Sequence, residues 1–196
     1  MIAIVDYGAG NLVSVKKAFD WLRQESLITS DPRDVAKAEK IVLPGVGHFS
    51  STASLTRSGL RNEITRGIEK GVPFLGICVG MQWMFEGSRE SPETPGLSLF
   101  QGECAPFPET VKSPHVGWNS LALEPRSRLF HGVVSSSFVY FTHSFRVPVS
   151  ADTSACCEYG GQFSAAVERD RLFGVQFHPE KSGETGLKML SNFCAL

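Results

Sequence analysis

The first half of the chain alternates short apolar runs with segments whose apolar residues recur at helical spacing. The apolar runs predict buried strands at residues 2–5, 26–29, 40–43 and 74–77. The intervening patterns predict helices over residues 12–22, from Asp31 onward and over residues 60–70. We expect Asn11 to cap the first of these helices. Strands that alternate with helices in this way indicate a mostly parallel sheet flanked by crossover helices.

The second half of the chain has a different pattern. Three β-type segments, at residues 138–142, 164–167 and 172–177, are separated by stretches containing Pro, Gly and Ser. They predict antiparallel strands added to the edge of the parallel sheet. Residues 183–196 predict a closing helix whose apolar residues face inward. Because the chain shows no linker or internal repeat, we expect one domain of the α/β class over residues 1–196.

The composition suits a globular protein with a sizeable core. Of its 196 residues, 42% are hydrophobic, and the formal net charge is −1. This balance leaves no basic stripe for nucleic acid and no polybasic patch for a membrane surface. The first residues lack the charged lead of a signal peptide, and no apolar stretch approaches the ~20 residues that span a bilayer. We therefore expect a cytoplasmic protein that binds neither nucleic acid nor membrane.

The spacing of cysteines and histidines argues against disulfides and metal sites. The five cysteines are an odd number without C-x-x-C spacing, and the five histidines also lack metal-ligand spacing. Gly8 and Gly10 follow a predicted strand as in a dinucleotide-binding fingerprint, but Val13 occupies the third glycine position. We expect no metal, no nucleotide and no other cofactor.

Cys78 lies at the centre of the sequence GICVG (residues 76–80), directly after the strand predicted at residues 74–77. Glycines two before and two after a nucleophile mark a sharp strand-to-helix turn, because a Cβ at either position would collide with neighbouring backbone. The central side chain is then exposed above the sheet. The spacing predicts a nucleophile elbow after a central strand, with a thiolate as the nucleophile. The alternative for Cys78 is a buried core cysteine in a glycine-rich turn.

The second catalytic element is the triplet His178-Pro179-Glu180. Proline fixes its own φ and pushes the preceding residue toward an extended conformation. In an extended segment residues i and i+2 project to the same side, so Glu180 can orient the imidazole of His178. That imidazole can in turn serve the thiol of Cys78. The three side chains together predict a Cys-His-Glu triad, although His178 alone would be typical of a satisfied core histidine.

These motifs, with four others, resemble those of a known family. The matching segments are DYGAGNL (residues 6–12), LPGVG (43–47), GICVGMQ (76–82), PHVGWN (114–119), YFTHSF (140–145) and GVQFHPEKS (174–182). The chain is similar to the class I (triad-type) glutamine amidotransferases. Within that class it is most similar to the glutaminase subunits of imidazole glycerol phosphate synthase, from histidine biosynthesis.

The resemblance implies a reaction and a partner. The glutaminase would hydrolyse glutamine to glutamate and ammonia through a cysteine thioester. It would form a heterodimer with a (β/α)₈-barrel cyclase, which uses the ammonia to make imidazole glycerol phosphate and an aminoimidazole carboxamide ribotide. A complex is physically reasonable because ammonia released into neutral water is mostly protonated and no longer nucleophilic.

The tetrahedral intermediate of such a hydrolysis carries an oxyanion, which needs preorganised donors. The amide of Val79, one residue beyond the nucleophile, follows from the elbow geometry. A second donor is expected in the loop Gly45-Val46-Gly47, where flanking glycines let a peptide rotate, and the resemblance places the family's oxyanion strand there. The corresponding candidates are Val46, Gly47 and Val79. The alternative for this loop is an ordinary glycine turn between strand and helix.

The resemblance also implies residues that surround glutamine. The matching positions are Gly45, Gln82, Glu90, Ser144 and Phe145. Glu90 would pair with the substrate ammonium, and Ser144 and Phe145 could act through backbone groups. Phe145 stands where the family often has tyrosine, so a backbone contact is expected there rather than a hydroxyl contact. The alternative for Glu90 is a solvated charge at a helix end.

A further group of residues is assigned to the partner interface. Its members are Asn11, His115, Trp118, Asn119, Tyr140 and Lys181. Trp118 lies in a polar, glycine-containing segment, which favours an exposed anchor over a core position, and aromatic residues are enriched at interface hot spots. Lys181 follows the catalytic triplet closely enough to touch a partner near the active site.

Three other functions remain open at this point. The chain could be the glutaminase of another synthase, such as pyridoxal phosphate synthase or a sugar-aminating enzyme. It could be a partner-free γ-glutamyl hydrolase or peptidase, although it shows no added domain. It could also be a catalytically silent binding protein, which the intact triad disfavours.

Overall fold

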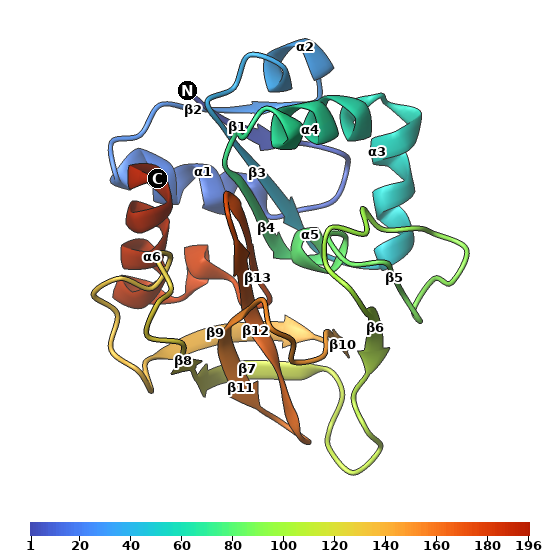
Figure 1. Ribbon diagram of the computed structural model, residues 1–196, viewed down its shortest axis with the longest axis vertical. Helices are drawn as coiled ribbons and strands as arrows, with labels where there is room; N and C mark the ends of the chain where they lie inside the picture. Colours follow the sequence, from blue (N-terminus) through green and yellow to red (C-terminus); the bar gives the residue numbers. More distant parts are fainter.

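The computed structural model describes residues 1–196 and is built around an eight-stranded sheet (Figure 1). In spatial order its strands are β2 (Ser26–Thr29), β1 (Ile2–Val5), β3 (Lys40–Gly45), β4 (Phe74–Cys78), β13 (Leu172–Val175), β12 (Gln162–Arg169), β11 (Thr153–Glu158) and β8 (Ala122–Leu123). The first five strands are parallel, and the last three are added antiparallel. This confirms the predicted α/β class and the four strands predicted in the first half.

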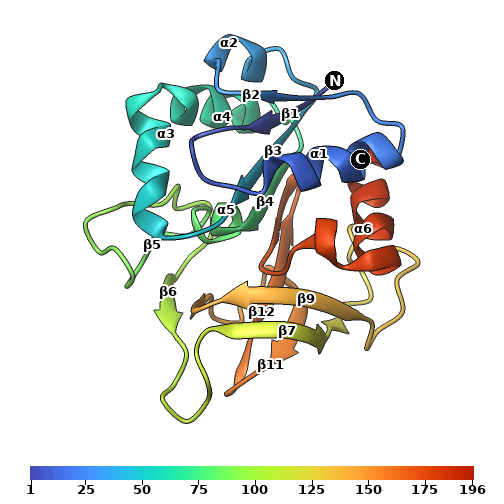
Figure 2. The ribbon, with the colours of Figure 1, turned by 180° about the vertical axis from the view of Figure 1, so that it is seen from behind.

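Helices cover both faces of the sheet. They are α1 (Leu12–Trp21), α2 (Pro32–Val35), α3 (Ala53–Arg57), α4 (Leu60–Glu69), α5 (Val79–Gln82) and α6 (Gly183–Ala195), with 3₁₀ turns η1 (Phe49–Thr52) and η2 (Pro179–Lys181). Figures 1 and 2 together show α1 and α6 on one face and α3 and α4 on the other. None of these helices is both long and apolar enough to cross a membrane.

The helix starts differ in their capping. Asp31 caps α2 by accepting a hydrogen bond from the amide of Arg33, and Pro32 follows at the first helical position. Asn11 occupies the N-cap position of α1, but its side chain makes no capping hydrogen bond. The predicted capping role of Asn11 is therefore wrong, because its backbone (φ −88°, ψ 58°) departs from the extended geometry that capping residues usually adopt.

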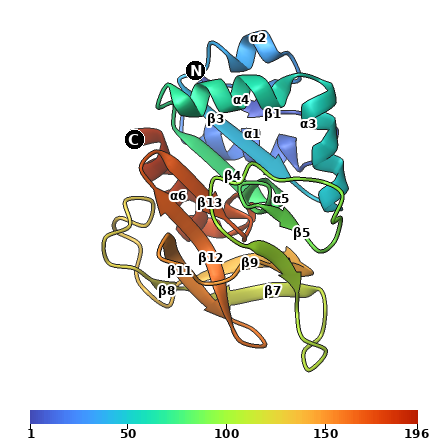
Figure 3. The ribbon, with the colours of Figure 1, turned by 45° about the vertical axis from the view of Figure 1, so that its right-hand side comes forward.

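Two of the predicted β-type segments lie elsewhere than expected. β9 (Phe138–His143) does not join the main sheet but pairs antiparallel with β7 (His115–Ser120) in a separate two-stranded sheet. β13 is a central parallel strand beside β4, not an antiparallel edge strand. Figure 3 shows β7 and β9 side by side. They lie near β11 and β12, the strands that extend the main sheet. A third, small sheet joins β10 (Phe145–Arg146), β6 (Glu103–Pro106) and β5 (Gly87–Ser88).

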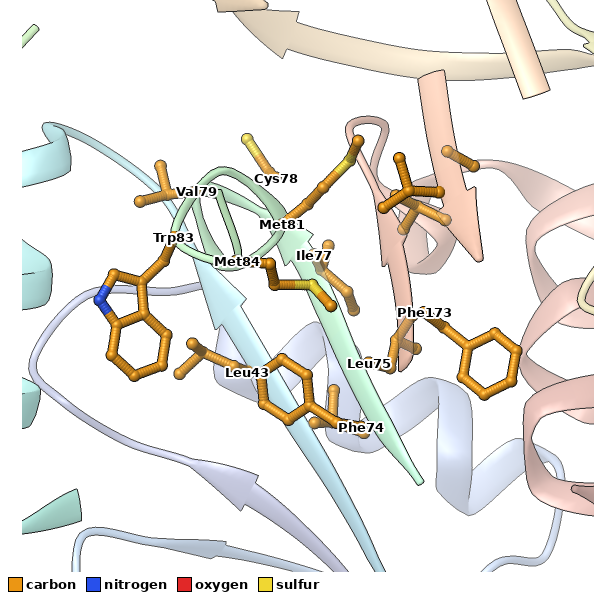
Figure 4. Packing of buried hydrophobic residues seen from close by; sticks show 14 of the residues in the cluster. Leu43, Phe74, Leu75, Ile77, Cys78, Val79, Met81, Trp83, Met84 and Phe173 are labelled. Carbon is orange, nitrogen blue, oxygen red and sulfur yellow. The ribbon is translucent and has the colours of Figure 1, made fainter. Parts of the chain in front are cut away.

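The core lies between the central strands and their covering helices. Leu43, Phe74, Leu75 and Phe173 are fully buried there, and Figure 4 shows Leu43 and Phe173 on opposite sides of β4. At that end β3 and β4 stop in register, so that Gly45 lies beside Cys78. The carboxyl ends of neighbouring parallel strands are where α/β proteins usually place their sites.

Candidate active site

Cys78 occupies a strained turn between β4 and α5. Its backbone has φ 55° and ψ −109°, a positive φ that costs a non-glycine residue energy. Figure 4 shows its side chain at the end of β4, pointing away from Phe74 and Leu75. A Cβ on Gly76 would lie 2.5 Å from the carbonyl oxygen of Gly80, and a Cβ on Gly80 would overlap the carbonyl oxygen of Leu43. The predicted collision is thus confirmed, and the strand-to-helix turn is a nucleophile elbow.

His178 and Glu180 form a buried pair behind the thiol. His178 Nδ1 lies 2.9 Å from Glu180 Oε1, and both side chains are 1% exposed. The predicted contact is confirmed, but its backbone geometry differs from the prediction. His178 is extended (φ −100°, ψ 98°), whereas Pro179 already begins the 3₁₀ turn η2. The turn shortens the path between the two side chains and brings the carboxylate against the ring.

The environment of His178 favours its protonated form. Burial lowers the pKa of His178, but the neighbouring Cys78 and Glu180 raise it by more, so its pKa lies above the ordinary value. His178 Nε2 and Glu180 Oε2 are buried without a hydrogen-bond partner. Because Glu180 engages Nδ1, Nε2 is the atom left to exchange a proton with a sulfur or a substrate.

A pocket of about 270 Å³ opens beside the thiol. Its lining residues are Val46, Gly47, Cys78, Val79, Gln82, Glu90, Pro114, Thr142, His143, Ser144 and Phe145. Seven of the residues that the sequence assigned to the oxyanion hole or to glutamine are thus brought together around the predicted nucleophile: Val46, Gly47, Val79, Gln82, Glu90, Ser144 and Phe145. A small polar molecule with a carbonyl carbon to attack is the kind of ligand that this arrangement can serve.

The loop after β3 has the freedom that an oxyanion donor needs. Gly47 has φ +89°, and a Cβ there would meet no atom within 4 Å. The amides of Val46 and Gly47 donate to no acceptor in the protein. Val79 begins α5, where backbone amides lack an intrahelical acceptor. Gly45 does not line the pocket: a Cβ there would lie 2.8 Å from Cβ of Val79, so its glycine permits close packing of β3 on the elbow.

Glu90 is held in place rather than solvated. Its Oε2 accepts a hydrogen bond of 2.7 Å from the amide of Phe49 at the start of η1, and the side chain is half-buried. The alternative of a free helix-end charge is therefore wrong. A carboxylate fixed on a pocket wall is suited to an ammonium group.

The family matches are decisive once this geometry is known. The family described as glutamine amidotransferase class-I matches residues 4–196, which is nearly the whole chain. The chain belongs to the class-I glutamine amidotransferases. The resemblance seen in its motifs is confirmed.

Full-length relatives place the chain in a narrower group within this family. The imidazole glycerol phosphate synthase subunit HisH of Caldanaerobacter subterraneus subsp. tengcongensis is 46% identical over 196 residues, covering 98% of this chain and 97% of the relative. The HisH subunit of Pyrococcus furiosus is 45% identical over 195 residues, with the same coverage. Within the class-I amidotransferases, the chain belongs to this HisH group.

Solved structures agree on the fold. A glutamine amidotransferase crystal structure superposes with a TM-score of 0.78 at 15% identity and covers 100% of both chains. PurLQS from Thermotoga maritima superposes with a TM-score of 0.74 at 21% identity, covering 99% of this chain and 97% of that one. At these identities the likeness supports the α/β architecture alone.

Gln176 is a residue of this amidotransferase site that the motifs did not single out. It is fully buried, its Nε2 lies 3.6 Å from Sγ of Cys78, and its Oε1 accepts from Nε2 of Gln82 at 3.1 Å. A local signal was available, because Gln176 stands only two residues before His178 in the matching segment 174–182. Cys78 Sγ also lies 3.9 Å from the carbonyl oxygen of Thr142.

Three of the residues assigned to the partner form a cluster beside the triad. Trp118 is 55% exposed and packs edge-on against Tyr140, with ring centroids 6.2 Å apart. Lys181 Nζ lies 5.7 Å from the centre of the Tyr140 ring. The carbonyl of Tyr140 accepts from the amide of His178 at 2.9 Å, so this cluster borders His178. A core role for Trp118 is therefore wrong.

The other three assigned residues are less accessible. His115 is only 4% exposed, so its side chain cannot be a direct partner contact, and that assignment is corrected. The reason is the two-residue period of β7, which turns His115 inward while Val116 and Trp118 face out. Asn119 is half-buried and hydrogen-bonds within the protein. Asn11 is half-buried at the start of α1.

No group of three or more potential ligand side chains is arranged to hold a metal ion. The five cysteines are free thiols, and four of them, Cys104, Cys156, Cys157 and Cys194, lie away from the pocket lining.

Proposed function

We propose that this HisH-family chain hydrolyses glutamine with Cys78 as the nucleophile and supplies the ammonia to the cyclase subunit of imidazole glycerol phosphate synthase. The observation that carries this proposal is the position of Cys78 at the wall of the pocket, with the buried His178–Glu180 pair behind it. The full-length HisH relatives support the identity of the synthase.

The first half-reaction is attack on the glutamine side chain. The thiolate of Cys78 adds to the carboxamide carbon, and the carbonyl oxygen becomes an oxyanion. We assign its stabilisation to the Val79 amide and to an amide of Val46 or Gly47, whose donors are unpaired in the loop. The C–N bond then breaks, and the proton held on Nε2 of His178 passes to the leaving nitrogen, which departs as neutral ammonia.

The second half-reaction hydrolyses the thioester. Neutral His178 accepts a proton from water through Nε2, and the resulting hydroxide oxygen adds to the thioester carbon. Collapse of this intermediate breaks the C–S bond, releases glutamate and restores the thiolate. Glu180 remains ionised and keeps the ring oriented through Nδ1.

The pocket wall opposite the thiol would hold the α-amino and α-carboxylate groups. Glu90 is positioned to pair with the ammonium, because only its Oε2 is engaged by Phe49. Ser144 and Phe145 offer backbone groups on the same wall, and Gln82 lies between them and the elbow. Gly45 acts indirectly, by letting β3 pack against Val79.

The partner would dock on the outer face of the β7–β9 sheet. This outer face carries Val116, Trp118, Ser120, Phe138, Tyr140 and Thr142, which the strand register places on one side. Val116, Trp118 and Phe138 are each more than half exposed. Exposed apolar side chains gathered on one face mark a protein interface, and Thr142 carries this face to the pocket edge. Asn11 and Lys181 would extend the contact, giving a heterodimer with a (β/α)₈ barrel.

The same proposal places the protein in the cytoplasm. Its substrate chemistry belongs to amino-acid biosynthesis, and its cysteines are free thiols, as expected in a reducing compartment.

The test combines the chain with the barrel cyclase from the same organism and measures glutamate release and cyclase product. Cys78→Ala should lower glutamine-dependent synthesis by at least ~10⁴-fold, while synthesis from added ammonia is unchanged. Cys157→Ala, at a buried thiol in β11 outside the pocket lining, is the matched control and should retain activity.

Near-normal glutamate release by Cys78→Ala would refute the nucleophile. Full glutamine hydrolysis by the chain alone would instead favour a partner-free hydrolase. Activation only by a different synthase would reassign the pathway.

A further inference from the structure

A chain of buried hydrogen bonds runs from the outer sheet to the pocket. Asn119 Nδ2 lies 3.4 Å from Nε2 of His115, and His115 Nδ1 lies 3.0 Å from Nε2 of His143. His143 Nδ1 lies 2.9 Å from the carbonyl oxygen of Phe145. We call these three side chains the histidine relay. His115 and His143 are titratable groups that the hydrolysis described above does not use.

The groups at the two ends of the relay determine which ring nitrogen of each histidine carries the proton. At the pocket end, the carbonyl of Phe145 can only accept, so His143 must carry its proton on Nδ1 and accept on Nε2. At the other end, Asn119 Oδ1 accepts from the amide of Ser120, and its Nδ2 donates to the carbonyl of Glu158. The Asn119 amide group is thereby oriented, so Nε2 of His115 must accept and Nδ1 must donate. Both ends require the same arrangement, in which each ring carries its proton on Nδ1 and accepts on Nε2.

The two rings are held neutral and immobile. Burial lowers the pKa of His115 to about 4 and that of His143 to about 3, so neither ring gains a second proton at neutral pH. His115 is stacked between Phe141 and Tyr159, with ring centroids 4.8 Å and 4.0 Å away. A neutral, stacked histidine has one donor and one acceptor in known places, which is what a relay requires.

The relay meets the catalytic residues at one carbonyl group. The oxygen of Phe145 accepts from His143 and also from Nε2 of Gln82. The same nitrogen of Gln82 donates to Gln176, which in turn lies against the thiol of Cys78. Rotation of the Phe145 peptide would therefore disturb both the relay and the support of the nucleophile.

We propose that His115 and His143 are positioning residues, which with Asn119 hold the Phe145 carbonyl and hence the glutamine-binding wall in register with the strand that carries Trp118. This inference rests on the proposed function, since it takes Phe145 as part of the glutamine wall. The histidine relay would therefore connect strand β7, which faces the partner, to the substrate pocket.

The first test needs no partner and no substrate. Nitrogen-15 NMR of the labelled chain should show two histidines that stay neutral with the proton on Nδ1 from pH 5 to pH 8. His115→Phe, which preserves the stacking, should remove one of these signals and shift the other. A protonated or Nε2-protonated form of either ring would overturn the relay, whatever the enzyme does.

The second test is kinetic, in the complex with the cyclase. His143→Leu should raise the KM for glutamine about 5- to 10-fold, the effect of one lost hydrogen bond, while kcat changes little. His143→Asn also loses the contact with His115 but can still donate to the Phe145 carbonyl, so it should recover part of the KM and lie between the wild type and His143→Leu. Equal effects of the two variants on KM would show that the ring serves only to fill space.

The third test places the change outside the pocket. Asn119→Ala should raise the KM for glutamine about 3- to 10-fold by freeing the far end of the relay. Asn192→Ala in α6 is the matched control and should leave this KM unchanged, because the Asn192 side chain donates only to the carbonyls of Leu129 and His131, which do not line the pocket. A lower melting temperature of Asn119→Ala with unchanged KM would refute the link. If even the wild-type complex released no glutamate, the proposed function would fail while the NMR result still judged the relay.

Discussion

We expect Glu180 to influence catalysis without touching the reacting atoms. Its carboxylate lies 2.9 Å from His178 Nδ1, is as buried as the ring, and belongs to the same short turn. Burial lowers the pKa of His178, but its two neighbours Cys78 and Glu180 raise that pKa by more. The pKa of His178 therefore depends on Glu180 as well as on Cys78.

A substitution at Glu180 should accordingly change the pH profile. Glu180→Gln keeps the shape but removes the negative charge that stabilises the imidazolium, so the pKa of His178 falls. The alkaline limb of the kcat/KM profile, where the imidazolium loses its proton, should move to lower pH. The loss of activity at the optimum should be smaller than the ~10²–10⁴-fold that a general base contributes.

The measurement is glutamate release by the complex across the pH range. Glu184→Gln, on the exposed first turn of α6, is the control and should leave the profile in place. An unmoved alkaline limb in Glu180→Gln would mean that Glu180 does not set the protonation of His178.

The short helix α5 at the elbow depends on a glycine, a residue without a side chain. α5 begins directly at the nucleophile, and it can approach β3 only because Gly80 has no Cβ to meet the carbonyl of Leu43. That carbonyl belongs to backbone, which cannot swing aside as a side chain would.

Gly80→Ala should lower the free energy of unfolding by about 1–3 kcal/mol and displace Cys78, with loss of glutaminase activity. Gly67→Ala in α4 is the matched control. Its Cβ would meet the flexible end of Ile41, and alanine is the better helix former by ~1 kcal/mol. Urea denaturation of both variants distinguishes them, and equal stabilities would contradict the close-packing argument.

The loop after β3 is the second element on which activity should depend. Because Gly47 has a positive φ and open space around it, the peptides of this loop can hold their amides toward or away from the pocket. We expect the free subunit to be nearly inactive and the occupied complex to hold the donor inward.

Glutaminase activity should then rise at least ~10²-fold when the cyclase and its ligand are added, the amount attributable to one oxyanion donor. Steady-state glutamate release with and without the partner measures this rise. A free subunit as active as the complex would rule out the switch.

The molecule as a whole presents one apolar face next to its active site. We propose that the chain forms a single domain, since one cluster of 47 buried residues runs through it. Outside that core, the β7–β9 outer face exposes Trp118 with Phe138 and Val116, while the inner face of the same sheet packs Val139 and Phe141 into the core.

Trp118→Ala should weaken association with the cyclase by ~2–4 kcal/mol, roughly 30- to 1,000-fold in Kd. The melting temperature of the free subunit should change little, because the side chain is already 55% exposed. Calorimetric titration and thermal melts give the two quantities. Trp21→Ala is the control, a tryptophan 77% exposed near the end of α1. Unaltered affinity in Trp118→Ala would remove this face from the interface.

Much of the fold and of the catalytic centre could be predicted from local patterns. The strands ending at Val5 and Cys78 are short apolar runs, and helix α4 follows its apolar period, so neighbouring residues suffice to indicate them. The elbow and the His178–Glu180 pair were equally local, because the glycines permit a close backbone approach that a Cβ would block and the proline fixes its own φ. Family resemblance then selected the residues that line the pocket.

The remaining features depend on which distant strands pair. The sequence of a β-type segment does not show which strand it will pair with. The pairing of β9 with β7, and the central position of β13 beside β4, therefore could not be predicted from local sequence. The same pairing turned His115 inward onto His143 and brought Gln176 to Cys78. Those contacts join residues far apart in the chain, and their energies arise only when burial removes competing water. The motifs thus indicated a candidate nucleophile and a candidate base, while the packing of separate sheets determined which residues support them.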